Sequence, residues 1–370
     1  MKKVLLSTAA VAGLAMVATP AAAQVSLELG GYFKGYGAYV DQDEDGTGEV
    51  NDLDFIRNTE IHFGGETTLD NGLTVGAHFE AEADGADGFG VDESYIYMSG
   101  GWGRVNAGSE DGAAYLLQVA APSADSNIDG LRQYVNPVNY AVLTGNATLT
   151  GNAPPLSAAN AQGIDYDMDP SGKSDKLTYL SPVMNGFQLG ASYSPDTDNA
   201  IEGGIGTDDV TDAIGDTYEV AVRYEGQFNN VGVITGAGYS HGDNENESAT
   251  GDDREAWNVG LDLDIGAFGV GAIYREDNGA RDGATASDEE TIVVGVDYTT
   301  GPFKLGASYY DQENTFATDG VDTQRYSGGV TYTYGPGMTF RGSIGHIEHD
   351  LSGADDVEAT YVTLGTQVNF

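Results

Sequence analysis

The chain has 370 residues, and its 58 Asp and Glu against 15 Lys and Arg give a formal net charge of −43. Such an excess of negative charge excludes the binding of nucleic-acid phosphates through a basic face. The sequence contains no cysteine, which excludes disulfides, thiol catalysis and zinc–thiolate sites. With 54 glycines and 22 tyrosines, it is typical of a large, ordered β protein rather than a disordered acidic chain.

The first 23 residues have the pattern of an export signal. Met1-Lys2-Lys3 is basic, residues 4–17 are apolar, and Ala21-Ala22-Ala23 ends in an A-x-A site. This predicts a secretory signal peptide that is cleaved after Ala23. Residues 24–370 are then expected to form a single domain outside the cytoplasm.

From Val25 onward, apolar and polar residues alternate in segments of about ten residues. In one such segment, Trp257, Val259, Leu261, Leu263 and Ile265 alternate with Asn258, Gly260, Asp262 and Asp264. A period of two predicts β-strands with one apolar and one polar face.

The connectors between these segments fall into two length classes. Short ones are Asp70–Gly72, Gly100–Gly101, Pro182–Gly186, Gly226–Asn230, Gly266–Ala267, Thr299–Pro302 and Gly335–Gly337. Long acidic ones lie near Asp41–Asp54, Asp84–Asp92, Ser109–Ser174, Pro195–Asp216, Gly242–Asp253, Asp277–Glu289, Gln312–Asp322 and His349–Asp356. Seven short and eight long connectors separate sixteen strands. A soluble β-sandwich would not sort its connectors by length, so the sequence predicts an all-β fold, a 16-stranded antiparallel transmembrane β-barrel.

Strand parity assigns a set of polar and charged side chains to the inner face of this barrel. They are Lys34, Glu60, His78, Glu80, Arg104, Lys176, Glu219, Arg223, Asp262, Asp264, Arg275, Asp297, Lys304, Arg325 and Arg341. The same parity places His62 beside His78, Glu60 and Glu80, a set that would suit a metal ion, although ordinary polar lining is favoured. We find no motif that pairs a nucleophile with a base, so the sequence predicts that the protein is not an enzyme.

One acidic segment has the pattern of a calcium loop. Asp41, Asp43 and Asp45 alternate ahead of Gly46, and Asp52 stands at position twelve. The flanking segments are strands rather than helices, and such patterns also arise in solvated acidic loops. Ca²⁺ bound by these four aspartates is the one cofactor that the sequence suggests.

Four segments carry a resemblance to a known family. They are Phe63–Leu73 (FGGETTLDNGL), Tyr95–Val105 (YIYMSGGWGRV), Lys176–Phe187 (KLTYLSPVMNGF) and the final Phe370. Their order and spacing resemble the general-diffusion porins of Gram-negative outer membranes.

The resemblance implies a homotrimer whose long third loop, about 109–174, folds into each barrel. Asp125, Asp129 and Arg132 of that loop would then line the constriction. Glu60 and Asp92 stand where many members of the family carry arginine, which leaves Arg104 and Arg132 as the basic candidates there. Phe370 would be read by the barrel-assembly machinery, and outer-membrane lipid and lipopolysaccharide would surround the barrel.

The expected function is a passive channel of the bacterial outer membrane. It would admit small hydrophilic solutes and ions by diffusion, with a moderate preference for cations because the chain is acidic. Two alternatives remain open: a solute-specific channel, and an acidic surface adhesin or structural barrel whose lumen is blocked.

Overall fold

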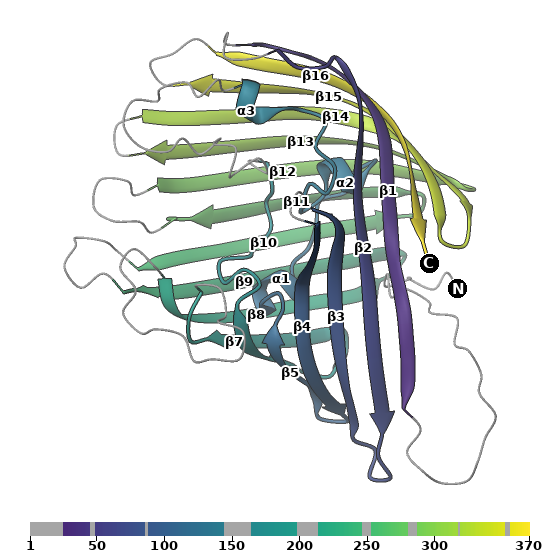
Figure 1. Ribbon diagram of the computed structural model, residues 1–370, viewed down its shortest axis with the longest axis vertical. Helices are drawn as coiled ribbons and strands as arrows, with labels where there is room; N and C mark the ends of the chain where they lie inside the picture. The colour runs from purple at the N-terminus through teal and green to yellow at the C-terminus, as the bar shows by residue number, and fades with distance from the viewer. Residues whose placement is uncertain are drawn as a thin grey trace.

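The computed structural model describes residues 25–44, 49–85, 88–143, 164–197, 214–245, 253–279, 287–316, 319–351 and 356–370. These residues form a closed antiparallel barrel in which each strand pairs with its neighbours in sequence and the first strand pairs with the last (Figure 1). The predicted 16-stranded barrel is therefore confirmed. The predicted signal peptide lies outside the described residues.

The strands are β1 (Ser26–Gln42), β2 (Leu53–Thr68), β3 (Thr74–Gly85), β4 (Gly88–Gly100), β5 (Gly103–Ser109), β6 (Asp175–Leu180), β7 (Phe187–Ser194), β8 (Ile214–Phe228), β9 (Val231–Asn244), β10 (Arg254–Ile265), β11 (Phe268–Asp277), β12 (Ser287–Thr300), β13 (Phe303–Phe316), β14 (Asp319–Gly335), β15 (Met338–Leu351) and β16 (Val357–Asn369). Three one-turn helices, α1 (Ala113–Leu116), α2 (Ser126–Asp129) and α3 (Tyr140–Leu143), lie between β5 and β6. Among the described residues, no helix is long and apolar enough to cross a membrane.

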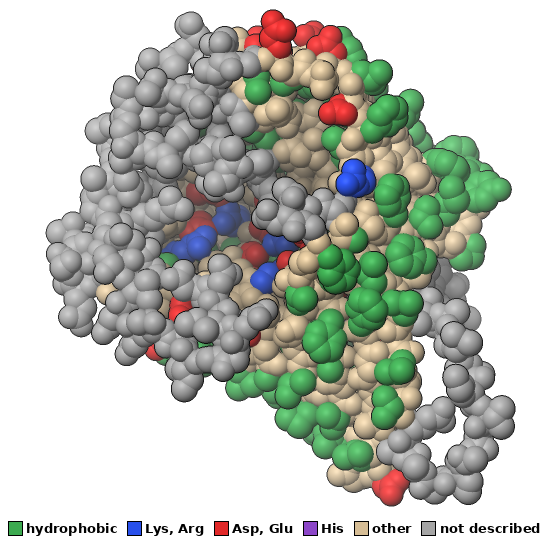
Figure 2. Space-filling model, in the orientation of Figure 1, with side chains coloured by type: hydrophobic (Ala, Val, Ile, Leu, Met, Phe, Trp, Pro, Cys, Tyr) green, Lys and Arg blue, Asp and Glu red, His purple; other side chains and the backbone are tan. Residues whose placement is uncertain are grey.

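The alternating pattern of the strands separates an apolar outer face from a polar inner face. On β16, Val362 and Leu364 are exposed on the outside, whereas Tyr361 and Thr363 are fully buried on the inside. Figure 2 shows apolar side chains over the outer wall and a hollow in which basic and acidic side chains gather. An apolar band outside and polar side chains inside are what a barrel in a lipid bilayer requires.

The short turns have the expected chemistry, but two of the predicted long connectors are largely strand. Gly72 and Asn229 adopt positive φ values of 82° and 55° at hairpin turns, where glycine and asparagine are favoured. At the predicted loops Asp84–Asp92 and Gln312–Asp322, however, strand pairing continues to Gly85 with Gly88 and to Phe316 with Asp319. The acidic residues in these two segments were therefore not evidence for loops. The end of a strand that projects into water can carry charged side chains on both faces.

Candidate functional site

The segment between β5 and β6 packs against the inner wall of the barrel. α1 contacts β6, β7, β8 and β9, while α3 contacts β16, and Figure 1 shows α1 and α2 within the ring of strands. Residues 144–163 of this segment lie outside the described part of the chain. We call residues 110–143 and 164–174 the inner loop.

Basic side chains on the wall hold the inner loop along its length. Arg223 on β8 donates to the carbonyl oxygen of Gln118 at 2.8 Å, and Arg325 on β14 donates to that of Ile128 at 3.2 Å. Arg341 on β15 reaches the carboxylate of Asp125 at 2.6 Å. Lys176 on β6 donates to the carbonyl oxygen of Gly172 at 2.7 Å. The inner loop is therefore fastened to strands on opposite sides of the barrel.

A row of inward-facing glycines lets the inner loop lie directly on the wall. We call Gly236, Gly260, Gly271, Gly295 and Gly306, on β9 to β13, the glycine stripe. A Cβ atom added to Gly295 would lie 1.8 Å from the carbonyl oxygen of Pro122, and one added to Gly306 would lie 2.6 Å from the nitrogen of Ala124. Any larger residue at these positions would push the loop away from the wall. Sequence reasoning missed this stripe, although glycine at inward parity on consecutive strands was a visible signal.

Beyond the glycine stripe, the inner loop fills part of the lumen with a hydrophobic core. Tyr140 and Tyr166 of the loop are buried together with Val293 on β12, Tyr310 on β13 and Tyr361 on β16. This side of the barrel interior is occupied by protein. Among the described residues, side chains on the opposite side are less covered, since His62 and His78 each keep 25% of the side chain exposed.

That opposite side is framed by two contacts between the inner loop and the wall. The ammonium of Lys34 on β1 lies 3.1 Å from the ring centroid of Tyr134 in the loop. Further round, the ammonium of Lys173 in the loop lies 3.5 Å from Asp92 on β4 and also contacts Glu93. Strands β2 and β3 lie between these two contacts. Of their inward side chains, His62, His78 and Glu80 are partly exposed, whereas Glu60 is buried beside them. We call the part of the lumen next to these side chains the open side.

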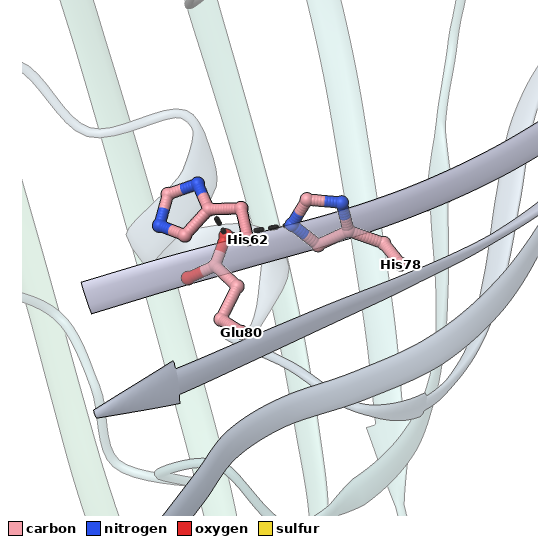
Figure 3. A group of neighbouring side chains, drawn as sticks. All are labelled: His62, His78 and Glu80. Atoms are coloured by element: carbon pink, nitrogen blue, oxygen red, sulfur yellow. Dashed lines mark hydrogen bonds and ion pairs between the residues drawn. The ribbon is translucent and has the colours of Figure 1, made fainter. Parts of the chain in front are cut away.

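Four of those side chains form one polar cluster, with two members from each strand. His62 Nε2 lies 2.7 Å from Glu60 Oε1, and His78 Nε2 lies 2.7 Å from Glu80 Oε1. The remaining nitrogen of His62, Nδ1, lies 3.8 Å from the same Glu80 oxygen. Figure 3 shows Glu80 between the two imidazole rings. We call Glu60, His62, His78 and Glu80 the His/Glu cluster.

Most basic side chains of the interior already have a carboxylate partner. Ion pairs join Arg132 to Asp167 and Asp169, Lys173 to Asp92, Glu93 and Asp111, Arg275 to Asp277 and Glu289, Lys304 to Asp297, Arg223 to Glu225, and Arg341 to Asp125. Glu60 and Glu80 differ, because the ion pairs of both involve histidine rather than lysine or arginine. Glu60 and Glu80 are therefore two neighbouring carboxylates that have no ion pair with a lysine or an arginine.

The residues predicted to line the pore take several positions. His78 and Glu80 are partly exposed at the open side, Lys34 and Glu60 are buried beside it, and Arg104 lies over the ring of Tyr97 at 4.0 Å. Asp125 and Arg341 are brought together, Asp129 accepts a hydrogen bond from Ser327 at 2.8 Å, and Arg223 and Arg275 hold the partners given above. Asp262 is half-buried on the inner face of β10. Arg132 is bound by Asp167 and Asp169 of its own loop.

Half-buried aspartates of the inner loop have altered proton affinities. Burial, with added repulsion from Asp167, raises the pKa of Asp165 to about 8. Burial, followed by repulsion from Asp111 and Asp167, raises the pKa of Asp169 to about 7, although Arg132 lies 2.8 Å away. One guanidinium cannot neutralise so many neighbouring carboxylates, so part of this cluster takes up protons near neutral pH.

The remaining predicted sites lie at the ends of strands. Phe370 exchanges two backbone hydrogen bonds with Gly31 on β1, at 3.0 and 3.1 Å, and its side chain is exposed. The carboxylate of Asp43 accepts the backbone N–H of Glu358 at 3.0 Å. Asp45 lies outside the described residues, and so the calcium site at Asp41, Asp43, Asp45 and Asp52 stays a prediction.

Comparison with known proteins adds relatives of low identity. An uncharacterized protein of Rickettsia felis is 26% identical over 176 residues, which cover 45% of this chain and 36% of the relative. An uncharacterized protein of Rickettsia conorii is 26% identical over 114 residues, which cover 29% of this chain and 25% of the relative. The chain thus spans about a third or less of the length of these relatives.

Solved structures share the fold over nearly the whole chain. The anion-selective porin from Comamonas acidovorans has a TM-score of 0.63 at 16% identity and covers 94% of this chain and 100% of its own. A loop-deletion mutant of OmpT, an outer-membrane protein of Vibrio cholerae, has a TM-score of 0.61 at 13% identity, covering 94% of this chain and 99% of its own. A family model described as Gram-negative porin matches residues 7–352. This chain therefore belongs to the Gram-negative porins and is a protein of the bacterial outer membrane.

Proposed function

We propose that this porin forms a water-filled channel through which small hydrophilic solutes and ions diffuse, with a moderate preference for cations. Membership of the porin family supports a channel rather than an enzyme. The narrowing of the lumen by the inner loop supports a size limit, since the loop is fastened to both sides of the barrel.

The cation preference rests on one observation, the distribution of charge partners. Lysines and arginines of the interior are largely bound by carboxylates, whereas Glu60 and Glu80 at the open side have histidine partners. A permeating ion responds to the fixed charge nearest its path, so this side attracts cations. The resemblance to an anion-selective porin does not oppose this, because 16% identity carries the fold and not the charges of the lumen.

The expected assembly is a homotrimer surrounded by lipid and lipopolysaccharide, with Phe370 serving assembly. Reconstitution in a planar bilayer tests the channel and the assembly together. Conductance that rises in three equal steps supports a trimer of open pores, whereas no conductance at any protein concentration would support the adhesin or blocked-barrel alternative.

The reversal potential under a KCl gradient tests the selectivity. We expect a sign that indicates K⁺ preference, larger at low salt because screening lengths there are longer, about 30 Å at 0.01 M against about 10 Å at 0.1 M. A sign that indicates Cl⁻ preference at low salt would contradict the proposal. Saturation of the current of one solute at low concentration would instead favour the solute-specific alternative.

A further inference from the structure

The geometry of the His/Glu cluster points to a second property, and we propose that His62, His78 and Glu80 bind a divalent transition-metal ion such as Zn²⁺ at the wall of the open lumen. Two imidazoles and one carboxylate are a ligand set that zinc accepts, with a fourth position left for water. Imidazole nitrogens favour Zn²⁺, Co²⁺, Ni²⁺ and Cu²⁺ over Ca²⁺ and Mg²⁺.

The distances within the cluster fit a metal ion with small adjustments. The candidate ligand atoms of His62, His78 and Glu80 all lie within 4.8 Å of one another. Two ligands of a tetrahedral zinc ion at about 2.0–2.1 Å from the metal lie about 3.3 Å apart. The observed separations from Glu80 Oε1 are 3.8 Å to His62 Nδ1 and 2.7 Å to His78 Nε2, one slightly longer and one slightly shorter than that value.

The orientation of His62 is already that of a metal ligand. Its Nε2 lies 2.7 Å from Glu60 Oε1, while Nδ1 faces Glu80 at 3.8 Å, too far for a hydrogen bond. When Nε2–H donates to Glu60, the lone pair of Nδ1 is directed at the position of the ion. Metal-bound histidines commonly donate their other N–H to a carboxylate in this way. Glu60 is thus a positioning residue, and it is held in turn by the hydroxyl of Tyr32, which donates to its other oxygen.

The strands hold these side chains in a rigid arrangement that ions can reach. His62 pairs directly with Glu80, and His78 with Gly64, in the register of β2 and β3. The imidazole rings of His62 and His78 lie edge to face, with centroids 5.8 Å apart. Side-chain exposure is 25% for each histidine and 20% for Glu80, so the cluster is partly covered yet open to the lumen.

Two other clusters among the described residues could compete for cations. Glu60, Glu80 and Asp92 offer only oxygen atoms and would favour Ca²⁺. His241, Asp243 and Asp253 lie at the ends of β9 and β10, and both carboxylate residues are exposed. A transition metal distinguishes the proposed site from the all-oxygen cluster, which would favour Ca²⁺. A substitution of His78 distinguishes it from the cluster around His241, which does not contain His78.

A bound ion would also change the charge that permeating ions meet. Glu60 and Glu80 together carry two negative charges when ionised, and a divalent ion beside them offsets both. Because Glu80 is partly exposed at the open side and Glu60 is buried directly beside it, occupation of the site should lower the cation preference.

The test uses Co²⁺ as a spectroscopic substitute for Zn²⁺ on the purified full-length protein after chelator treatment. We expect one Co²⁺ per chain with the intense visible bands of tetrahedral coordination, displaced by Zn²⁺ and not by Ca²⁺. His78→Ala should weaken binding at least tenfold, and Glu60→Gln should weaken it about 10- to 100-fold without changing the melting temperature. His346→Ala is the matched control, because His346 hydrogen-bonds Thr360 at the exposed side of the wall, and it should bind like the wild type.

Several results would overturn the proposal. One is that the wild type gives no tetrahedral Co²⁺ bands at millimolar metal. Another is that His78→Ala binds Co²⁺ as tightly as the wild type. Either result would mean that the His/Glu cluster is only hydrogen-bonded lining of the lumen. Should Ca²⁺ displace Co²⁺ as well as Zn²⁺ does, the all-oxygen cluster is the site instead. If His78→Ala folds poorly, His62→Gln must give the same loss. These readouts do not depend on conductance, so they stand apart from the test of the channel.

Discussion

The guanidinium of Arg341 on β15 lies 2.6 Å from the carboxylate of Asp125 in the inner loop. Asp125 is fully buried, and it also accepts a hydrogen bond from the hydroxyl of Tyr36 on β1 at 2.9 Å. One loop residue is therefore bound by two neighbouring regions of the wall, where the first and last strands close the barrel. This contact fixes how far the loop reaches across the lumen.

Replacing Arg341 with methionine should loosen the inner loop. The change leaves the carboxylate of Asp125 buried without its cation, which costs about 3 kcal/mol in comparable buried pairs. We expect a lower melting temperature and noisier single-channel currents. Lys304→Met is the control, since its pair with Asp297 at 3.0 Å is more exposed and should contribute little. The double variant Arg341→Met with Asp125→Asn should recover part of the lost stability, because no charge is then left buried without a partner. If Arg341→Met alone were as stable as the wild type, the contact would not hold the loop.

The glycine stripe predicts a variant with a wider pore. Gly295→Val places a side chain where the carbonyl oxygen of Pro122 now lies, so the inner loop must move away from β12. A strand position otherwise accepts valine, and the barrel should still assemble. Higher conductance per pore is the expected outcome. Gly90→Ala, where nothing lies within 4 Å of the added atom, should leave conductance unchanged, and equal conductance in both variants would contradict the predicted movement.

Glu80 should contribute directly to ion preference. Glu80→Gln removes a charge at the open side while it keeps the size and hydrogen-bonding capacity of the side chain. The reversal potential under a KCl gradient should shift toward zero, more strongly at low salt. Glu255→Gln, which removes an exposed carboxylate near the end of β10, serves as the control and should shift it less. A Glu80→Gln channel with wild-type selectivity would place the ion path elsewhere.

The sequence was sufficient for the barrel but not for the path of the inner loop. Alternation within each strand is a local signal, and it predicted sixteen strands and the inward parity of Glu60 and His78. The loop depends on contacts between residues far apart in the chain, such as Arg341 with Asp125, for which no local pattern exists. Arg132 is a second example, since no local pattern indicated that it would pair with Asp167 and Asp169 of its own loop, more than 30 residues along the chain.

The His/Glu cluster was partly visible in the sequence. Parity alone placed two histidines and two glutamates on adjacent strands. Parity could not show that Glu60 binds one nitrogen of His62 while Glu80 faces the other, because that depends on the register of β2 and β3 and on side-chain rotation. This geometry is what favours a metal site over ordinary lining.

The half-buried Asp165 predicts that the inner loop becomes less stable as pH rises. Its pKa of about 8 in the folded protein exceeds the value of about 3.9 for an unperturbed aspartate, so folding favours the protonated form. The stabilisation from this proton is complete below about pH 4, and it declines as pH rises and is lost above about pH 8, with a slope of at most about 1.4 kcal/mol per pH unit. Between pH 6 and pH 9 we therefore expect the melting temperature to fall and current fluctuations to increase.

Asp165→Asn isolates this effect, because asparagine is neutral at every pH and still offers an oxygen to the backbone N–H of Gln133, which now donates to Asp165 at 2.6 Å. The variant should show a flatter dependence of melting temperature on pH, and its largest gain over the wild type should come at pH 9. Asp41→Asn, at the exposed end of β1, should retain the wild-type dependence. If Asp165→Asn also kept the wild-type pH dependence of the melting temperature, another group would release the proton. Asp169 would then be the next residue to replace, because its pKa is raised to about 7.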